Sequence, residues 1–157
     1  MKACFIGHQK IEKTEALRAS LKERVIALIH KGVRIFLFGS KSEFNDLSWE
    51  VVTELKKEYA YIKRVYVRSA YQHIDKSYEE YLFQFYEETY FPKKIAKAGK
   101  GAYVERNYEL IDNSAYCIFY YSENYIAQSR RKSGTGIAYR YAVKKGKEII
   151  NLYKTDL

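Results

Sequence analysis

Short apolar segments alternate with longer stretches of helical spacing from one end of this chain to the other. The apolar segments have the length and the β-branched and aromatic content that are typical of buried strands. They lie at residues 2–6, 33–38, 62–67, 115–120 and 148–152. Because parallel strands need a crossover, usually a helix, between them, this alternation predicts an α/β fold. We expect a Rossmann-like three-layer domain with a mainly parallel sheet of about five strands.

The stretches between these segments predict the helices. A first helix is expected between a Thr14 cap and Gly32, and a second over residues 46–59. Further helices are expected over residues 103–112 and after Gly134. The predicted buried stripes are Leu17, Leu21, Val25 and Leu28 in the first helix and Leu47, Val51 and Leu55 in the second.

Residues 68–100 do not follow the alternation. Tyrosine and phenylalanine are dense here, acidic pairs interrupt them, and Pro92 breaks any helix. We interpret the segment as an elaborated crossover that packs over one end of the sheet. It is a candidate lid or a candidate subunit interface, and the aromatic density favours a symmetric dimer.

The length of 157 residues predicts a single domain, 1–157. No apolar run has the roughly 20 residues that span a bilayer, and the N-terminus does not resemble a signal peptide. Cys4 and Cys117 lie in expected strands, which is typical of buried thiols in a reducing compartment. The three histidines have no ligand spacing. We therefore expect a cytoplasmic protein with no metal, no cofactor and no membrane partner.

The net charge of +9 favours anionic partners such as nucleotides, nucleic acid or an acidic surface. The 17 tyrosines could serve as stacking faces for bases, but they suit ordinary core packing equally well.

In a parallel sheet, ligands bind beyond the carboxyl ends of the strands. Glycines, hydroxyls and cations follow four of the expected strands, which predicts a pocket for a phosphorylated ligand at this edge. The most informative loop is residues 133–135, because a small-residue turn before a helix can hold a phosphate against free N–H groups. The candidate binding residues are Gly7, His8, Gly39, Ser40, Asp46, Arg106, Arg131, Ser133, Gly134 and Thr135.

Several candidates also have a purely structural interpretation. Arg106 could pair with Glu109 or Asp112 on its own helix, and His8 could cap backbone groups. Asp46 could be only the N-cap of its helix. Ser133 could cap a tight turn, and residues 130–132 could form a solvated basic loop.

Five short motifs follow one another along the chain: Phe5-Ile6-Gly7-His8, Phe38-Gly39-Ser40, Glu105-Arg106-Asn107, Ile111-Asp112-Asn113-Ser114 and Ser133-Gly134-Thr135. In this order they resemble the SLOG superfamily, the Rossmann-like fold shared by the DNA-processing protein DprA and the cytokinin-activating LOG enzymes. The resemblance spans residues 3–152 and is strongest to small bacterial and phage members.

The resemblance implies a nucleotide or nucleotide-derived ligand. LOG enzymes cleave the N-glycosidic bond of a nucleotide with a Glu-Arg pair and a Gly-Gly-x-Gly-Thr-x-x-Glu loop. Arg106 matches the arginine and Gly134-Thr135 the Gly-Thr, but Ala138 stands where the loop has its catalytic glutamate. An alanine can neither activate water nor stabilise a charged sugar.

We therefore expect a sensor or sequestering protein that binds a nucleotide-derived small molecule without turnover. Two alternatives stay open at this point. One is a nucleoside-monophosphate N-glycosidase of the LOG type, with Asp46, Glu105 or Glu109 in place of the missing glutamate. The other is a single-stranded nucleic-acid binder like DprA.

Overall fold

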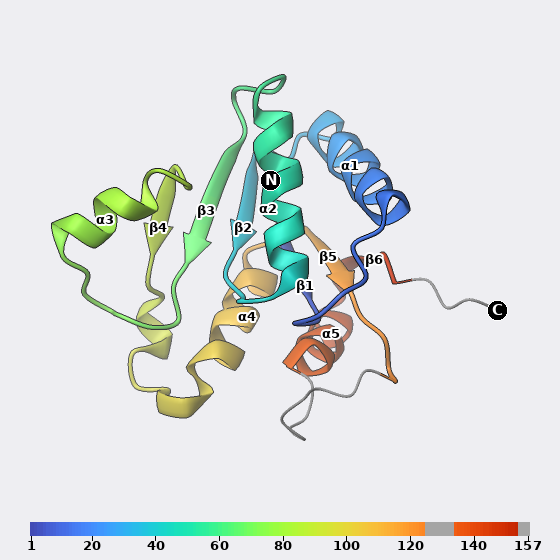
Figure 1. The fold of residues 1–157 in the computed structure, drawn as a ribbon. Helices are drawn as coiled ribbons and strands as arrows, with labels where there is room; N and C mark the ends of the chain where they lie inside the picture. The colour runs from blue at the N-terminus through green and yellow to red at the C-terminus, as the bar shows by residue number, and fades with distance from the viewer. Residues whose placement is uncertain (125–133, 154–157) are drawn as a thin grey trace.

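A computed structural model describes residues 1–124 and 134–153, and its six strands form one parallel sheet (Figure 1). Across the sheet the strand order is β4-β3-β2-β1-β5-β6. The chain therefore moves outward from β1 to β4 and then returns to place β5 on the other side of β1. The strands are β1 Lys2–Gly7, β2 Ile35–Phe38, β3 Lys63–Val67, β4 Glu88–Tyr90, β5 Tyr116–Tyr120 and β6 Glu148–Asn151.

Helices cover both faces of the sheet, as a Rossmann-like three-layer fold requires. Helices α1 and α2 lie on one face, while α4 and α5 lie on the other (Figure 1). The short helix α3 lies at the β4 edge, away from these four (Figure 1). The helices are α1 Glu15–His30, α2 Glu43–Lys56, α3 Lys76–Leu82, α4 Ala102–Asp112 and α5 Gly134–Lys144, with 3-10 turns η1 Lys93–Ile95 and η2 Gly99–Gly101.

The central strand β1 is buried on both faces. Ala3 and Phe5 point into the core beneath α1 and α2, while Cys4 and Ile6 point into the core beneath α4 and α5. Successive side chains of a strand alternate between faces, so a strand covered on both sides is a continuous apolar run. This is why the apolar segments of the sequence located the strands correctly.

The helix starts follow local capping chemistry. The Thr14 side chain accepts a hydrogen bond of 3.0 Å from the Leu17 backbone N–H, which confirms the predicted cap. Helix α2 begins earlier than predicted, because the Ser42 hydroxyl accepts a bond of 3.0 Å from the Asn45 N–H. Asp46 is therefore not the N-cap. It lies in the first turn, where the helix dipole favours a carboxylate.

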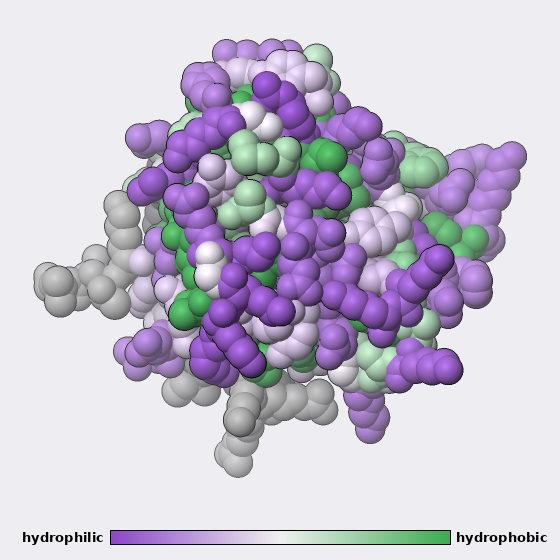
Figure 2. All heavy atoms as spheres, turned by 180° about the vertical axis from the view of Figure 1, so that it is seen from behind, coloured by the Kyte–Doolittle hydropathy of each residue, from purple (hydrophilic) through white to green (hydrophobic). Residues whose placement is uncertain are grey.

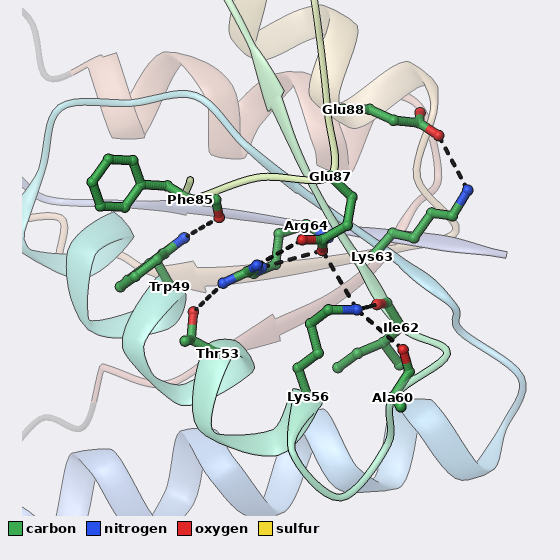
Figure 3. Close-up of polar contacts among 10 residues, drawn as sticks. All are labelled: Trp49, Thr53, Lys56, Ala60, Ile62, Lys63, Arg64, Phe85, Glu87 and Glu88. Carbon is green, nitrogen blue, oxygen red and sulfur yellow. Dashed lines mark hydrogen bonds and ion pairs between the residues drawn. The ribbon is translucent and has the colours of Figure 1, made fainter. Parts of the chain in front are cut away.

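Strand β4 is the strand that the sequence did not predict. It comprises only Glu88–Tyr90 and pairs in parallel with β3. The segment before it is fixed to α2 by Arg64, which bonds Glu87 at 2.6 Å and Thr53 at 3.1 Å (Figure 3). The Trp49 indole adds a bond of 3.1 Å to the Phe85 carbonyl (Figure 3). Long-range polar contacts of this kind hold the crossover in place, and a single-sequence pattern does not reveal them.

The structure also bears on the two thiols, on membrane-spanning helices, on metal-binding clusters and on the surface. Cys4 and Cys117 are free, buried and opposite one another in the β1–β5 register. Within the described chain, no helix is long and apolar enough to cross a membrane, and no three metal-binding side chains gather. The face over α4 and α5 is largely hydrophilic, with hydrophobic residues scattered over it (Figure 2).

Candidate functional site

The strand order reverses between β1 and β5, and this is the point at which open α/β sheets bind ligands. His8 follows β1 here and is buried, at 1% exposure. Its Nε2 accepts a hydrogen bond of 2.7 Å from the Ser122 N–H, beyond the end of β5. Burial lowers the pKa of His8 to about 4, so the imidazole is neutral at physiological pH. His8 thus caps a backbone group, which was the structural alternative for this residue.

Arg106 projects from α4 to the same carboxyl edge. It is 5% exposed, and its Nη1 donates hydrogen bonds to the Gly39 carbonyl and, at 3.3 Å, to the Ser69 hydroxyl. Its Nε donates to the Asn107 side chain at 3.2 Å. Burial lowers the pKa of Arg106 to about 10, which still leaves the guanidinium charged at neutral pH.

Neither Glu109 nor Asp112 of α4 pairs with Arg106. Glu109 contacts Lys94 at 2.9 Å and accepts a bond from the Tyr90 hydroxyl, while Asp112 contacts Lys94 and the Tyr141 hydroxyl. The predicted alternative of an ion pair within the helix is therefore wrong. No carboxylate of the described residues lies within ion-pair distance of the Arg106 guanidinium.

Two of the glycines make room for protein side chains. A Cβ atom on Gly7 would lie only 2.4 Å from the Phe44 ring, which packs across the end of β1. A Cβ atom on Gly39 would lie 2.6 Å from Cδ of Arg106. Internal packing thus explains both glycines, and Gly39 is what allows Arg106 to reach the sheet edge.

Helix α5 begins at this edge as well. Thr135 is buried, and a Cβ atom on Gly134 would lie 3.4 Å from the Tyr103 ring of α4, an ordinary contact. Three residues after Thr135, the Ala138 side chain is buried in the core beneath α4 and α5. Residues 125–133 lie outside the described residues, and with them the candidates Arg131 and Ser133.

A cleft of about 850 Å³ opens on the α2 side of the carboxyl edge. One wall is formed by the β1–α1 and β2–α2 loops and the exposed side of α2, and the other by β3 and the α3 segment. The lining residues are Gln9, Lys10, Lys13, Ser40, Lys41, Ser42, Glu43, Asn45, Asp46, Trp49, Glu50, Tyr66, Tyr78, Tyr81, Leu82, Phe85 and Tyr86.

Burial affects two phenols of the cleft. It raises the pKa values of Tyr66 and Tyr86, so both hydroxyls stay protonated and neutral at neutral pH. The Asp46 carboxylate adds to this effect on the pKa of Tyr86, so its negative charge lies near that ring. The cleft therefore combines neutral aromatic surface with side chains of both charges, which are the acids Glu43, Asp46 and Glu50 and the lysines Lys10, Lys13 and Lys41.

A model of the YspA SLOG family matches residues 4–157, which is nearly the whole chain. The chain belongs to the YspA SLOG family. Membership confirms the resemblance drawn from the sequence and indicates a nucleotide-related Rossmann-like protein. None of the curated proteins compared matches the chain.

For this member of the family, the predicted site residues lie at three places along the carboxyl edge of the sheet. Ser40 and Asp46 line the cleft, while Arg106 lies behind the end of β2 with its guanidinium on the Gly39 carbonyl. Gly39 joins these two places, because its N–H donates to Asn45 of the cleft at 3.3 Å. His8, Gly134 and Thr135 lie at the same edge, nearer to β5 and α5.

Sequence reasoning missed the aromatic lining of the cleft. Trp49 follows Asp46 by one helical turn, so the two residues share a face of α2. This spacing could have indicated that Trp49 lies beside Asp46 in the site. Tyr78, Tyr81 and Phe85 were noted only as part of an aromatic segment. No local pattern indicated that this segment would face α2, because the two are joined through β3 and the polar contacts around Arg64.

Proposed function

We propose that this protein binds a nucleotide-derived small molecule at the carboxyl edge of the sheet and does not turn it over. The ligand phosphate is placed beside Arg106 and the start of α5. The observation that carries the proposal is the buried Arg106 guanidinium, which has no carboxylate partner among the described residues. Sensing or sequestering a nucleotide signal would both use such a site.

The physical argument concerns the cost of burying a charge. A buried cation is stable only when it is paired or well hydrogen-bonded, and Arg106 uses a carbonyl, an amide oxygen and a hydroxyl. None of these partners carries a negative charge. A phosphate would supply that charge, and arginine binds phosphate through its planar, forked donors.

The absence of turnover is argued from α5. Ala138, at the position of the glutamate in the LOG pattern, packs in the apolar core. Of the substitutes considered, Glu109 is already engaged by Lys94 and Tyr90. Asp46 lines the cleft on the opposite side of the end of β2 from Arg106. Neither Glu109 nor Asp46 is therefore expected to act beside the ribose. Glu105, the half-buried neighbour of Arg106, is the remaining substitute, and base release that Glu105→Gln abolishes would identify it as the catalytic group.

The test is calorimetry with purine nucleoside monophosphates, followed by chromatography of the same samples. Arg106→Gln is expected to weaken binding by about tenfold to a hundredfold, since a hydrogen bond to a charged group contributes about 1.5–3 kcal/mol. Gly134→Val should also abolish binding in a folded protein, because its side chain would keep the phosphate away from the backbone. The matched control is Arg24→Gln, since Arg24 is an exposed arginine of α1.

No free base is expected in any of these samples. Base release that Arg106→Gln abolishes would overturn the proposal in favour of the N-glycosidase. Unchanged affinity in a folded Arg106→Gln protein would remove the phosphate site.

A further inference from the structure

We propose that the cleft between α2 and the α3 segment holds the base of the ligand and that Asp46 selects a guanine. This inference rests on the proposed function for the phosphate, but it concerns different side chains. It follows from three properties of the cleft: its aromatic walls, the Asp46 carboxylate one helical turn before Trp49, and its link to Arg106 through Gly39.

The aromatic wall is a continuous set of ring contacts. The Tyr78 and Tyr81 rings stack with centroids 6.2 Å apart, Tyr81 meets Phe85 at 5.2 Å, and Phe85 meets Trp49 at 5.9 Å. The Trp49 indole is anchored to the Phe85 carbonyl, with Arg64 over its ring at 5.6 Å (Figure 3). Rings that are already held in place bind a planar base with little loss of side-chain entropy.

A second pair of rings lies deeper in the cleft. Tyr66 and Tyr86 stack with centroids 5.2 Å apart and an interplanar angle of 19°. Tyr86 in turn contacts Phe38 of the core at 6.0 Å. The pair is therefore rigidly supported from below, and it gives the cleft an apolar floor. Stacking of a base on such rings contributes about 1–3 kcal/mol.

Asp46 supplies the polar contact. Its side chain is exposed in the cleft and makes no hydrogen bond or ion pair with the residues that the structure describes. Glu50, one turn further along α2, is different because Arg18 holds its carboxylate at 3.0 Å. Asp46 can therefore accept hydrogen bonds from a ligand without first breaking an ion pair. Glu43, the third cleft carboxylate of α2, also has no ion pair among the described residues, but it is half-buried and lies one turn further from Trp49.

The choice of base follows from donor and acceptor chemistry. An ionised carboxylate only accepts hydrogen bonds, and it does so best from two parallel donors. The Watson–Crick edge of guanine offers adjacent donors at N1 and N2. Adenine and cytosine each offer one amino donor beside an acceptor nitrogen, and uracil offers one N–H between two carbonyls. The cleft therefore favours guanine.

One residue connects the two parts of the site. The Gly39 N–H donates to Asn45, which lines the cleft, and the Gly39 carbonyl accepts from Arg106. Ser40, which follows, also lines the cleft. A single nucleotide lying across the end of β2 would thus reach the aromatic rings with its base and Arg106 with its phosphate.

The experiment separates base from phosphate by calorimetry with guanosine, adenosine and their 5′-monophosphates. The wild-type protein is expected to favour guanine over adenine by about tenfold, the lower part of the range for a bidentate contact. Asp46→Asn should remove this preference and keep the gain in affinity from nucleoside to monophosphate. Arg106→Gln should remove that gain and keep the preference. Glu23→Gln, an exposed carboxylate of α1, is the control.

Each outcome has one meaning. Equal binding of guanine and adenine compounds by the wild type, or a guanine preference that survives in Asp46→Asn, overturns the inference. Guanosine preference without any gain from the phosphate retains the base site and removes the proposed phosphate site. Binding of single-stranded oligonucleotides but of no mononucleoside, with affinity falling steeply with salt, overturns both.

Discussion

At the scale of single residues, His8 has the clearest consequence for stability. Its pKa is lowered from 6.5 to about 4 by burial, so the unfolded chain binds a proton more readily than the folded protein. Between these two values stability therefore falls as the pH falls. We expect a loss of about 2 kcal/mol between about pH 7.5 and about pH 5.

Urea unfolding at both pH values measures this loss. His8→Gln keeps an acceptor for the Ser122 N–H but does not titrate, so its pH dependence should be smaller by that amount. The fold is retained if the variant unfolds cooperatively at neutral pH. An identical pH dependence in the two proteins would show that His8 is not the group responsible.

The sequence located individual site residues better than it assigned their roles. It put Gly7 and Gly39 at the carboxyl edge, because position after a strand is a local property, whereas Arg106 was included through the family resemblance. It could not show that Phe44 fills the space at Gly7 or that Arg106 fills the space at Gly39. Those neighbours are brought together by the sheet, far from one another along the chain.

At the scale of elements, strong periodic patterns in the sequence were sufficient to locate the long helices and the buried strands. The helix after Thr14 and the buried strands were predicted nearly to their observed bounds. The predicted start of α2 was wrong because Ser42 and Asp46 are both residue types that cap helices. The hydrogen bond from the Asn45 N–H to the Ser42 hydroxyl shows that Ser42 is the cap. Strand β4 was missed because it has only three residues, between an acidic and a proline-containing segment, and so few residues show no alternation of apolar and polar side chains.

The contact between β1 and α2 can be tested at Gly7. A Cβ atom there would lie 2.4–2.6 Å from three atoms of Phe44, so Gly7→Ala must displace the ring. Overpacking of a core typically costs about 1–3 kcal/mol. Chemical denaturation should show a loss of that size. The same change at Gly101, where a Cβ atom would meet nothing within 4 Å, is the matched control.

A double-mutant cycle tests whether the Phe44 ring is the specific obstacle to a side chain at Gly7. If the Phe44 ring is the obstacle, Gly7→Ala should cost much less in a Phe44→Leu background than in the wild type. Equal costs in both backgrounds would place the strain elsewhere, for example in the backbone of β1.

At the scale of the whole molecule, the topology was predictable and the cleft was not. Alternation of strands and helices is enough to give a parallel sheet with its binding edge at the carboxyl ends. The cleft depends on how the crossover 68–100 folds back beside α2, and contacts such as Arg64 with Glu87 decide that. The ligand phosphate and base were therefore expected at one edge, but the walls that would hold the base were not foreseen.

Self-association stays a prediction, and the structure gives it a location. Tyr71, Tyr81 and Phe83, in and around α3, are 72%, 54% and 49% exposed. Aromatic side chains grouped on a protruding segment are typical of interface cores, and twofold dimers are the commonest oligomers. Light scattering at tens of micromolar protein should give the mass of a dimer. Phe83→Glu should give a monomer, because it buries a charge at the contact without altering a residue that lines the cleft.

The control for this change is Tyr61→Glu. Tyr61 is as exposed as Tyr81, at 54%, but it lies beyond α2 with Arg34 stacked on its ring at 4.4 Å. A dimer that survives Phe83→Glu would place the interface on another face, and a wild-type monomer at these concentrations would rule the dimer out. Because Tyr81 also lines the cleft, a dimer through α3 would cover one wall of the proposed base site. Ligand affinity should then depend on protein concentration in the wild type and not in Phe83→Glu.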